Sequence, residues 1–170
     1  MNTYLTIKTL HILSSVLLVG TGFGTAFYLF FANRTGSVPA IAAVSKLVVR
    51  ADLWFTTPAV VVQPLSGLWL AHAAGWHWST PWIGLSIGLY LLAGACWLPV
   101  VWLQYEMARM AASAQADGAT ALPPRYWRFA RWWEWLGYPA FIAMVVVYYL
   151  MVASRPGDRG PGRTTLTQFR

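Results

Sequence analysis

The longest uncharged stretch of this chain is the feature that most constrains its fold. Between Asp52 and Glu106 there is no Asp, Glu, Lys or Arg. A helix needs about 20 apolar residues to cross a bilayer, so the run Leu53–Tyr105 has room for two crossings and a turn. A soluble protein of this size could not bury such a run. The sequence therefore predicts that lipid is the solvent, and that each ionisable residue within the membrane has a functional reason to be there.

The composition agrees with a membrane protein and excludes several other classes. Of the 170 residues, 58% are hydrophobic and only 10% are charged, and the mean hydropathy is +0.51. The single cysteine, Cys96, excludes an internal disulfide and a multi-cysteine metal site within one chain. The net charge of +7 comes from arginines that flank apolar segments, where they anchor helices and set topology. We therefore expect no nucleic-acid partner.

Four apolar segments are long enough to cross a bilayer. They cover approximately residues 4–31, 53–73, 82–103 and 135–153. Helices are required because backbone exposed to lipid must satisfy its own hydrogen bonds. The prediction is an all-α, polytopic four-helix membrane bundle that forms a single domain over residues 1–154. Residues 155–170 read as a flexible basic tail.

The connections between the spans predict further structure and a topology. Residues 37–39 resemble a helix start, so residues 40–52 are expected to extend the second span beyond the bilayer. Residues 123–133 read as an amphipathic helix lying in the interface before the fourth span. The first and third connections carry seven of the twelve Lys and Arg residues, which are Arg34, Lys46, Arg50, Arg109, Arg125, Arg128 and Arg131. The positive-inside rule makes their face cytoplasmic and both termini periplasmic, in a bacterial inner membrane.

Polar residues on the first span form a helical stripe. At about 100° per residue the following residues share one face: Tyr4, Lys8, His11, Ser15, Leu18, Gly22 and Thr25. Because a stripe that mixes a cation, an imidazole and hydroxyls is costly in lipid, it is expected to face the bundle interior. Gly22 would leave room beside His11 for a flat macrocycle.

His72 ends the second span, which runs antiparallel to the first. His11 and His72 are therefore expected at compatible heights, as the two axial ligands of a six-coordinate haem b. Haem propionates need cations near the surface, and Lys8 and Arg155 are expected to supply them. Ser15 and Gly22 complete the predicted cofactor site.

Simpler interpretations compete with each of these assignments. A membrane histidine such as His11 can hydrogen-bond another helix, for example through Ser15 or Gln63. Lys8 can extend to the surface without any ligand, and His72 is ordinary for an interfacial residue.

Three other features have structural readings. Asp52 beside Arg50 reads most simply as a capping or surface pair, with a proton-handling role as the alternative. Glu134 is a candidate partner for Arg131. The motif Gly20-x-x-x-Gly24 suggests a close helix contact, which a homo-oligomer would provide.

Several short motifs resemble a known family. They are Lys8-Thr9-Leu10-His11, Trp97-Leu98-Pro99-Val100-Val101 with Gln104, Leu122-Pro123, Trp133, Gly137, Pro139-Ala140 and Tyr149-Leu150-Met151-Val152. Together they resemble the bacterial predicted integral membrane family called domain of unknown function 2269. The resemblance covers nearly the whole ordered chain. Family members tend to close with Lys-Pro where this chain has Arg155-Pro156, which keeps the cation.

The family resemblance implies architecture more than activity. A more distant similarity points to the four-helix, haem-containing protoporphyrinogen oxidases of bacteria, to which only His11 carries over. The leading functional hypothesis is a small b-type haem protein that passes electrons between a quinol-like membrane donor and a partner. The alternatives are a porphyrinogen oxidase-like enzyme and a haem-free structural or assembly subunit of a larger membrane complex.

Overall fold

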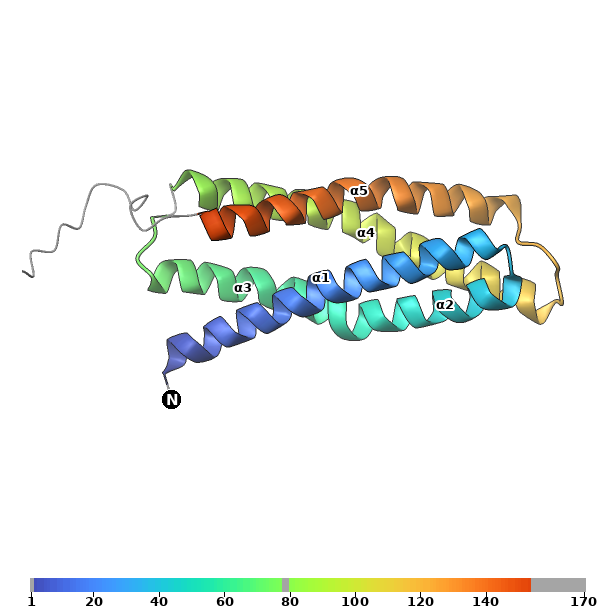
Figure 1. Ribbon diagram of the computed structural model, residues 1–170, viewed down its shortest axis with the longest axis horizontal. Coiled ribbons are helices and arrows are strands. Elements are labelled where there is room, and N and C mark those ends of the chain that lie inside the picture. Colours follow the sequence, from blue (N-terminus) through green and yellow to red (C-terminus); the bar gives the residue numbers. More distant parts are fainter. Residues whose placement is uncertain (1, 78–79, 154–170) are drawn as a thin grey trace, which may run out of the picture.

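A computed structural model describes residues 2–77 and 80–153, and all the regular structure in these residues is helical (Figure 1). The elements, in order along the chain, are α1 (Thr3–Thr35), α2 (Val38–Ala51), the π-helix η1 (Asp52–Thr56), α3 (Thr57–Ala73), α4 (Pro81–Ala116) and α5 (Pro124–Ala153). The prediction of an all-α chain is confirmed for this part of the protein.

The long helices lie side by side and give the molecule two distinct ends (Figure 1). The start of α1, the end of α3, the start of α4 and the end of α5 lie at one end, which we call the terminal end. The α1–α2 and α4–α5 connections lie at the other, which we call the loop end. The segments α2, η1 and α3 follow one another without a break, so helix runs from residue 38 to residue 73. The chain is helical over residues 40–52 and continuous with the predicted second span, as expected from the sequence.

Three of the helices are long and apolar enough to cross a membrane. These are α1, α4 and α5, with 33, 36 and 30 residues. The second predicted span falls on η1 and α3, and α3 alone has 17 residues. The π-helical turn lies within the continuous helix from residue 38 to residue 73. The α-helices α2 and α3 on either side of this turn are each shorter than the roughly 20 residues of a typical crossing.

The hydrophobic core lies toward the loop end. Its most deeply buried side chains are Leu29, Ile41, Met107 and Tyr126, which come from α1, α2, α4 and α5. The Tyr126 hydroxyl donates a hydrogen bond of 2.7 Å to Oδ1 of Asn33, and this contact ties α5 to the end of α1. The core therefore joins α1, α2, α4 and α5 at the loop end of the molecule.

The structure differs from the prediction of a separate interfacial helix over residues 123–133. These residues form the first turns of α5, which continues without interruption to Ala153. Tyr126, Ala130 and Trp133 are buried in the protein core, so the apolar face of this segment packs on the bundle rather than in the lipid headgroups. Arg125, Arg128 and Arg131 are exposed on the same helix.

Candidate functional site

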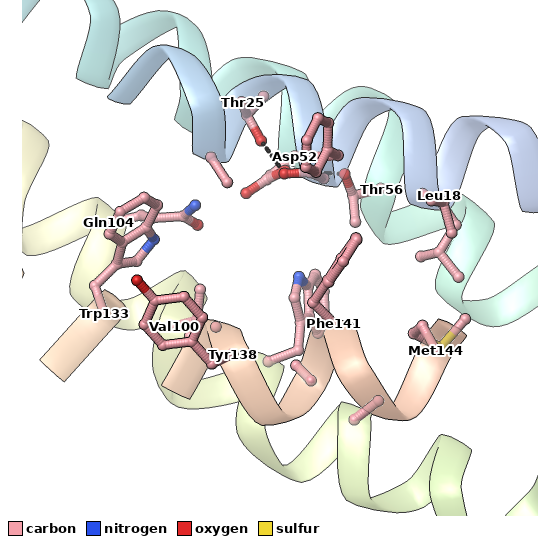
Figure 2. A pocket seen from close by; sticks show the side chains of 18 of the residues that line it. Leu18, Thr25, Asp52, Thr56, Val100, Gln104, Trp133, Tyr138, Phe141 and Met144 are labelled. Carbon is pink, nitrogen blue, oxygen red and sulfur yellow. Dashed lines mark hydrogen bonds between the residues drawn. The ribbon is translucent and has the colours of Figure 1, made fainter. Parts of the chain in front are cut away.

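A cavity of about 680 Å³ lies between α1, η1, α4 and α5 (Figure 2). Its volume falls in the range of small-molecule sites in proteins. Most of its wall is apolar or aromatic. One end is formed by Leu18, Val60 and Met144, and the other end, toward the loops, by Asp52, Gln104 and Trp133. The cavity thus has an apolar end near the middle of the helices and a polar end nearer the loop end.

The polar end depends on the π-helical turn of η1. Pro58 follows this turn, and a proline ring clashes with the carbonyl of the residue four positions earlier, here Trp54. The wider turn moves the hydrogen bonding by one residue, so that the Thr57 N–H donates to the Asp52 carbonyl. The Thr57 hydroxyl donates to the same carbonyl at 2.9 Å. Such π-turns are often found at functional sites.

The π-helical turn directs two polar side chains inward. Asp52 and Thr56 are 5% and 3% exposed, whereas the three residues between them are 49–73% exposed. The Thr56 hydroxyl donates a hydrogen bond of 2.9 Å to Oδ1 of Asp52. The sequence reading of Asp52 as a surface pair with Arg50 is wrong, because the carboxyl group is buried and lines the cavity.

Gln104 of α4 faces Asp52 across the polar end. Its amide is close enough to interact with the Asp52 carboxyl group, and Figure 2 shows it directed toward that group and the cavity. The residue is 5% exposed, and its Oε1 atom is buried without a hydrogen-bond partner among the described residues. Leaving a buried acceptor unpaired costs about 1–3 kcal/mol. The polar end therefore contains one buried acceptor, Oε1 of Gln104, to which no described residue donates a hydrogen bond.

The electrostatic character of the cavity is acidic, in contrast to the basic chain around it. Asp52 and Glu134 are both lining residues, and none of the described residues that line the cavity is Lys, Arg or His. The hydroxyl of Tyr138 points toward the cavity from α5 (Figure 2). A ligand that donates hydrogen bonds would match this surface better than one that only accepts them.

Tyr90 closes the apolar end and links α4 to α3. A proline at position 64 lacks the N–H that would normally bond the carbonyl of Val60. The Tyr90 hydroxyl replaces it with a hydrogen bond of 2.7 Å to that carbonyl. Pro64 leaves the Val60 carbonyl without its helical donor, so a tyrosine hydroxyl in the wall of an apolar cavity has a structural role.

The structure places His11 outside this cavity, in a hydrogen-bonded contact between α1 and α3. Its Nδ1 lies 2.9 Å from Oγ of Ser66, and its Nε2 lies 3.2 Å from Nε2 of Gln63. Ser14 donates to Oε1 of Gln63 at 2.5 Å. The ring packs on Gly67, where an added Cβ would meet His11 Cε1 at 3.0 Å. The alternative in which His11 bonds to Gln63 of another helix is the arrangement that the structure shows.

The other predicted site residues are dispersed. His72 is exposed on α3, and at about 100° per residue it lies roughly opposite Gln63 on that helix. Lys8 is exposed on the first turns of α1. Ser15 is buried, but its hydroxyl bonds the Ile12 carbonyl at 2.8 Å. Arg155 lies outside the described residues. Gly22 is the one predicted site residue that lines the cavity.

These positions do not fit a haem held between His11 and His72. His72 projects from α3 on the side away from the face that Gln63 presents to His11. Both ring nitrogens of His11, which projects from α1, already have side-chain neighbours within hydrogen-bonding distance. An axial ligand needs a free ring nitrogen directed at the metal. No group of three or more His, Cys, Asp or Glu residues that could hold a metal ion occurs among the described residues.

Two predicted contacts are not formed among the described residues. An added Cβ at Gly20 or Gly24 would meet nothing within 4 Å, so no described helix packs closely against that motif. Among the described residues the only ion pair joins Arg109 to Glu106, so the predicted pairing of Glu134 with Arg131 is wrong. Glu134 instead borders the cavity.

The fold and its exposed apolar helices define an integral membrane protein. Comparison with protein families agrees: residues 5–156 match the model of the predicted integral membrane protein family called domain of unknown function 2269. The chain belongs to this family, as its motifs indicate. Searches among curated proteins and solved structures found no match. The resemblance to haem-containing protoporphyrinogen oxidases therefore gains no support.

Proposed function

We propose that this membrane protein binds a lipid-soluble molecule of the quinol class in the cavity between α1, η1, α4 and α5. The observation that carries the proposal is the polar end, where a buried carboxyl group and the unpaired Oε1 of Gln104 border an otherwise apolar and aromatic space. A quinol supplies two hydroxyl donors on a flat ring, together with an apolar tail. A buried ionisable side chain in a membrane protein is by default a candidate functional residue, because its burial is costly without a partner.

The membrane arrangement that goes with this function has four crossings. In it η1 and α3 form the second crossing, and the loop end faces the cytoplasm of a bacterial cell because it carries the seven basic residues of the first and third connections. The apolar segments are flanked in the sequence by the acidic residues Asp52, Glu106 and Glu134. The polar end of the cavity then lies near the cytoplasmic membrane boundary, and its apolar end lies near the midplane.

Access from the lipid is a further reason to favour a lipid-soluble ligand. Three aromatic residues of the cavity wall, Phe23, Phe27 and Phe141, are 46–57% exposed, so they border both the cavity and the outer surface. The Phe23 and Phe141 rings, whose centroids are 5.7 Å apart, make a side-chain contact between α1 and α5. A molecule dissolved in the bilayer can enter between these helices by displacing side chains rather than backbone.

The test is a binding titration with the protein in lipid nanodiscs. Trp97 and Trp133 line the cavity, so a ligand that enters it should quench their fluorescence. We expect saturable quenching by a short-tailed quinol and weaker binding of the matching quinone, which only accepts hydrogen bonds. Stronger binding of a lipophilic ammonium ion with a ring of the same size would instead assign the acidic cavity to cations and overturn the quinol proposal.

The haem-based electron-transfer hypothesis has a separate check. That the protein binds a haem b stays a prediction of the sequence, and a reduced-minus-oxidised absorption spectrum of the purified protein tests it. Quinol binding as proposed here needs no haem. The porphyrinogen oxidase alternative rests on His11, whose nitrogens both face α3 side chains, and the assembly-subunit alternative rests on the open surface beside Gly20 and Gly24.

A further inference from the structure

A second, smaller cavity of about 280 Å³ lies toward the loop end, between the last turns of α1 and the first turns of α5. Its lining differs in chemistry from that of the larger cavity. Two arginines, Arg34 and Arg131, border it together with Asn33 and Trp127. Phe30 and Glu134 belong to the walls of both cavities, so the two spaces are neighbours.

Asn33 gives this cavity a buried donor without a partner. The residue is 6% exposed, and its Oδ1 accepts the hydrogen bond from Tyr126, which fixes the amide. Its Nδ2 is buried and has no hydrogen-bond partner among the described residues. A buried N–H group without an acceptor is costly, so a bound oxygen atom at this position would be stabilising.

The two arginines border the cavity together with Asn33, and both are exposed residues. Arg34 lies over the Phe30 ring, 4.2 Å from the ring centroid, and this stacking leaves its N–H groups available. Within the described residues neither arginine forms an ion pair, although Glu134 also borders the cavity. Two guanidinium groups and one amide donor outweigh the single carboxylate, so the cavity favours a ligand with negative charge and several acceptor oxygens.

We propose that this smaller cavity binds the phosphodiester group of an anionic phospholipid. Guanidinium groups match the geometry of phosphate oxygens, and basic pockets between membrane helices on the cytoplasmic side bind acidic headgroups. Trp127, 37% exposed, and Phe31, 51% exposed, would lie against the glycerol and upper acyl chain. This site is independent of quinol binding, because it uses the donors of Asn33, Arg34 and Arg131 rather than the acceptors at Asp52 and Gln104.

The test compares two double variants that remove the same charge. R34Q/R131Q removes both guanidinium groups of the cavity. R125Q/R128Q removes two exposed arginines from the same membrane level, and it also loses a stacked arginine, because Arg125 lies 5.1 Å from the Phe129 ring centroid. Native mass spectrometry after extraction from vesicles of phosphatidylcholine and phosphatidylglycerol measures the phosphatidylglycerol retained. The same measurement with added inorganic phosphate shows whether the headgroup or free phosphate is the ligand.

We expect the native protein and R125Q/R128Q to retain phosphatidylglycerol. We expect R34Q/R131Q to bind this lipid with an affinity at least about tenfold lower. Equal loss in both double variants would show only a general charge effect and would overturn the proposal. Equal retention of phosphatidylcholine would also overturn it. So would displacement of phosphatidylglycerol by inorganic phosphate, because free phosphate would then be the ligand. An unchanged thermal unfolding midpoint in R34Q/R131Q separates loss of lipid from loss of fold.

Discussion

Asp52→Asn is expected to lower the affinity for a short-tailed quinol by about tenfold to a hundredfold. A hydrogen bond to a charged group contributes about 1.5–3 kcal/mol, and about 1.4 kcal/mol corresponds to a factor of ten. The asparagine keeps the shape of the side chain and can still accept the hydrogen bond from Thr56. The loss should therefore be seen in ligand binding, measured by tryptophan quenching in nanodiscs, with little change in thermal unfolding.

A matched control is Asp117→Asn, which removes a carboxylate from the connection between α4 and α5. Asp117 is exposed, and the Ser113 hydroxyl lies 3.5 Å from its Oδ2. This variant should bind the quinol as the native protein does. If Asp52→Asn binds normally, or if Asp117→Asn weakens binding to the same extent, the buried carboxyl group is not the acceptor for the ligand.

Gly67→Leu is expected to lower the free energy of unfolding by about 1–3 kcal/mol, because overpacking a tight contact costs about that much. Even the Cβ of an alanine at this position would meet His11 Cε1 at 3.0 Å. The larger side chain must push α1 away from α3 and break the contacts of His11 with Ser66 and Gln63. Thermal unfolding in detergent measures the effect, and Gly67→Ala should show a smaller loss.

Two further variants make this prediction specific to the histidine contact. Gly88→Leu on α4 is the control, because an added Cβ at Gly88 would meet nothing within 4 Å. In a His11→Ala background the cost of Gly67→Ala should fall, since the ring that it meets is gone, and a double-mutant cycle measures that coupling. Equal costs in both backgrounds would show that the tight packing of the imidazole on Gly67 does not contribute to stability.

The sequence predicts the helical class, the membrane environment and the family well, because these follow from long apolar segments and local motifs. It predicts only part of the inward-facing stripe of the first span, since Tyr4 and Lys8 of that stripe are exposed. Ser15 is buried, and Leu18, Gly22 and Thr25 line the cavity. What periodicity cannot supply is the partner of each side chain. His11 lies on α1 and His72 on α3, and the rotation of α3 about its own axis decides whether the two histidines share one site.

The candidate site was missed because its signal is spread over three segments. Asp52 reads as the edge of an apolar span, and apolar periodicity does not indicate that the turn before Pro58 becomes π-helical. Two signals could have pointed to it. One is the spacing of Asp52 and Thr56 ahead of a proline, which places two polar groups on one side of a helix that needs extra hydrogen bonds. The other is Gln104, an amide near the end of a long uncharged run.

The most direct measurement of the central claim is photolabelling with a quinol that carries a photoreactive group on its ring. The protein would be labelled in lipid nanodiscs, with and without excess unlabelled quinol, and the labelled positions would then be mapped by peptide sequencing. We expect competable labelling on η1, α4 and α5 near Asp52, Gln104 and Tyr138, all of which border the polar end of the cavity. Labelling confined to the surface around His72, or labelling that excess quinol does not reduce, would contradict a quinol site in this cavity.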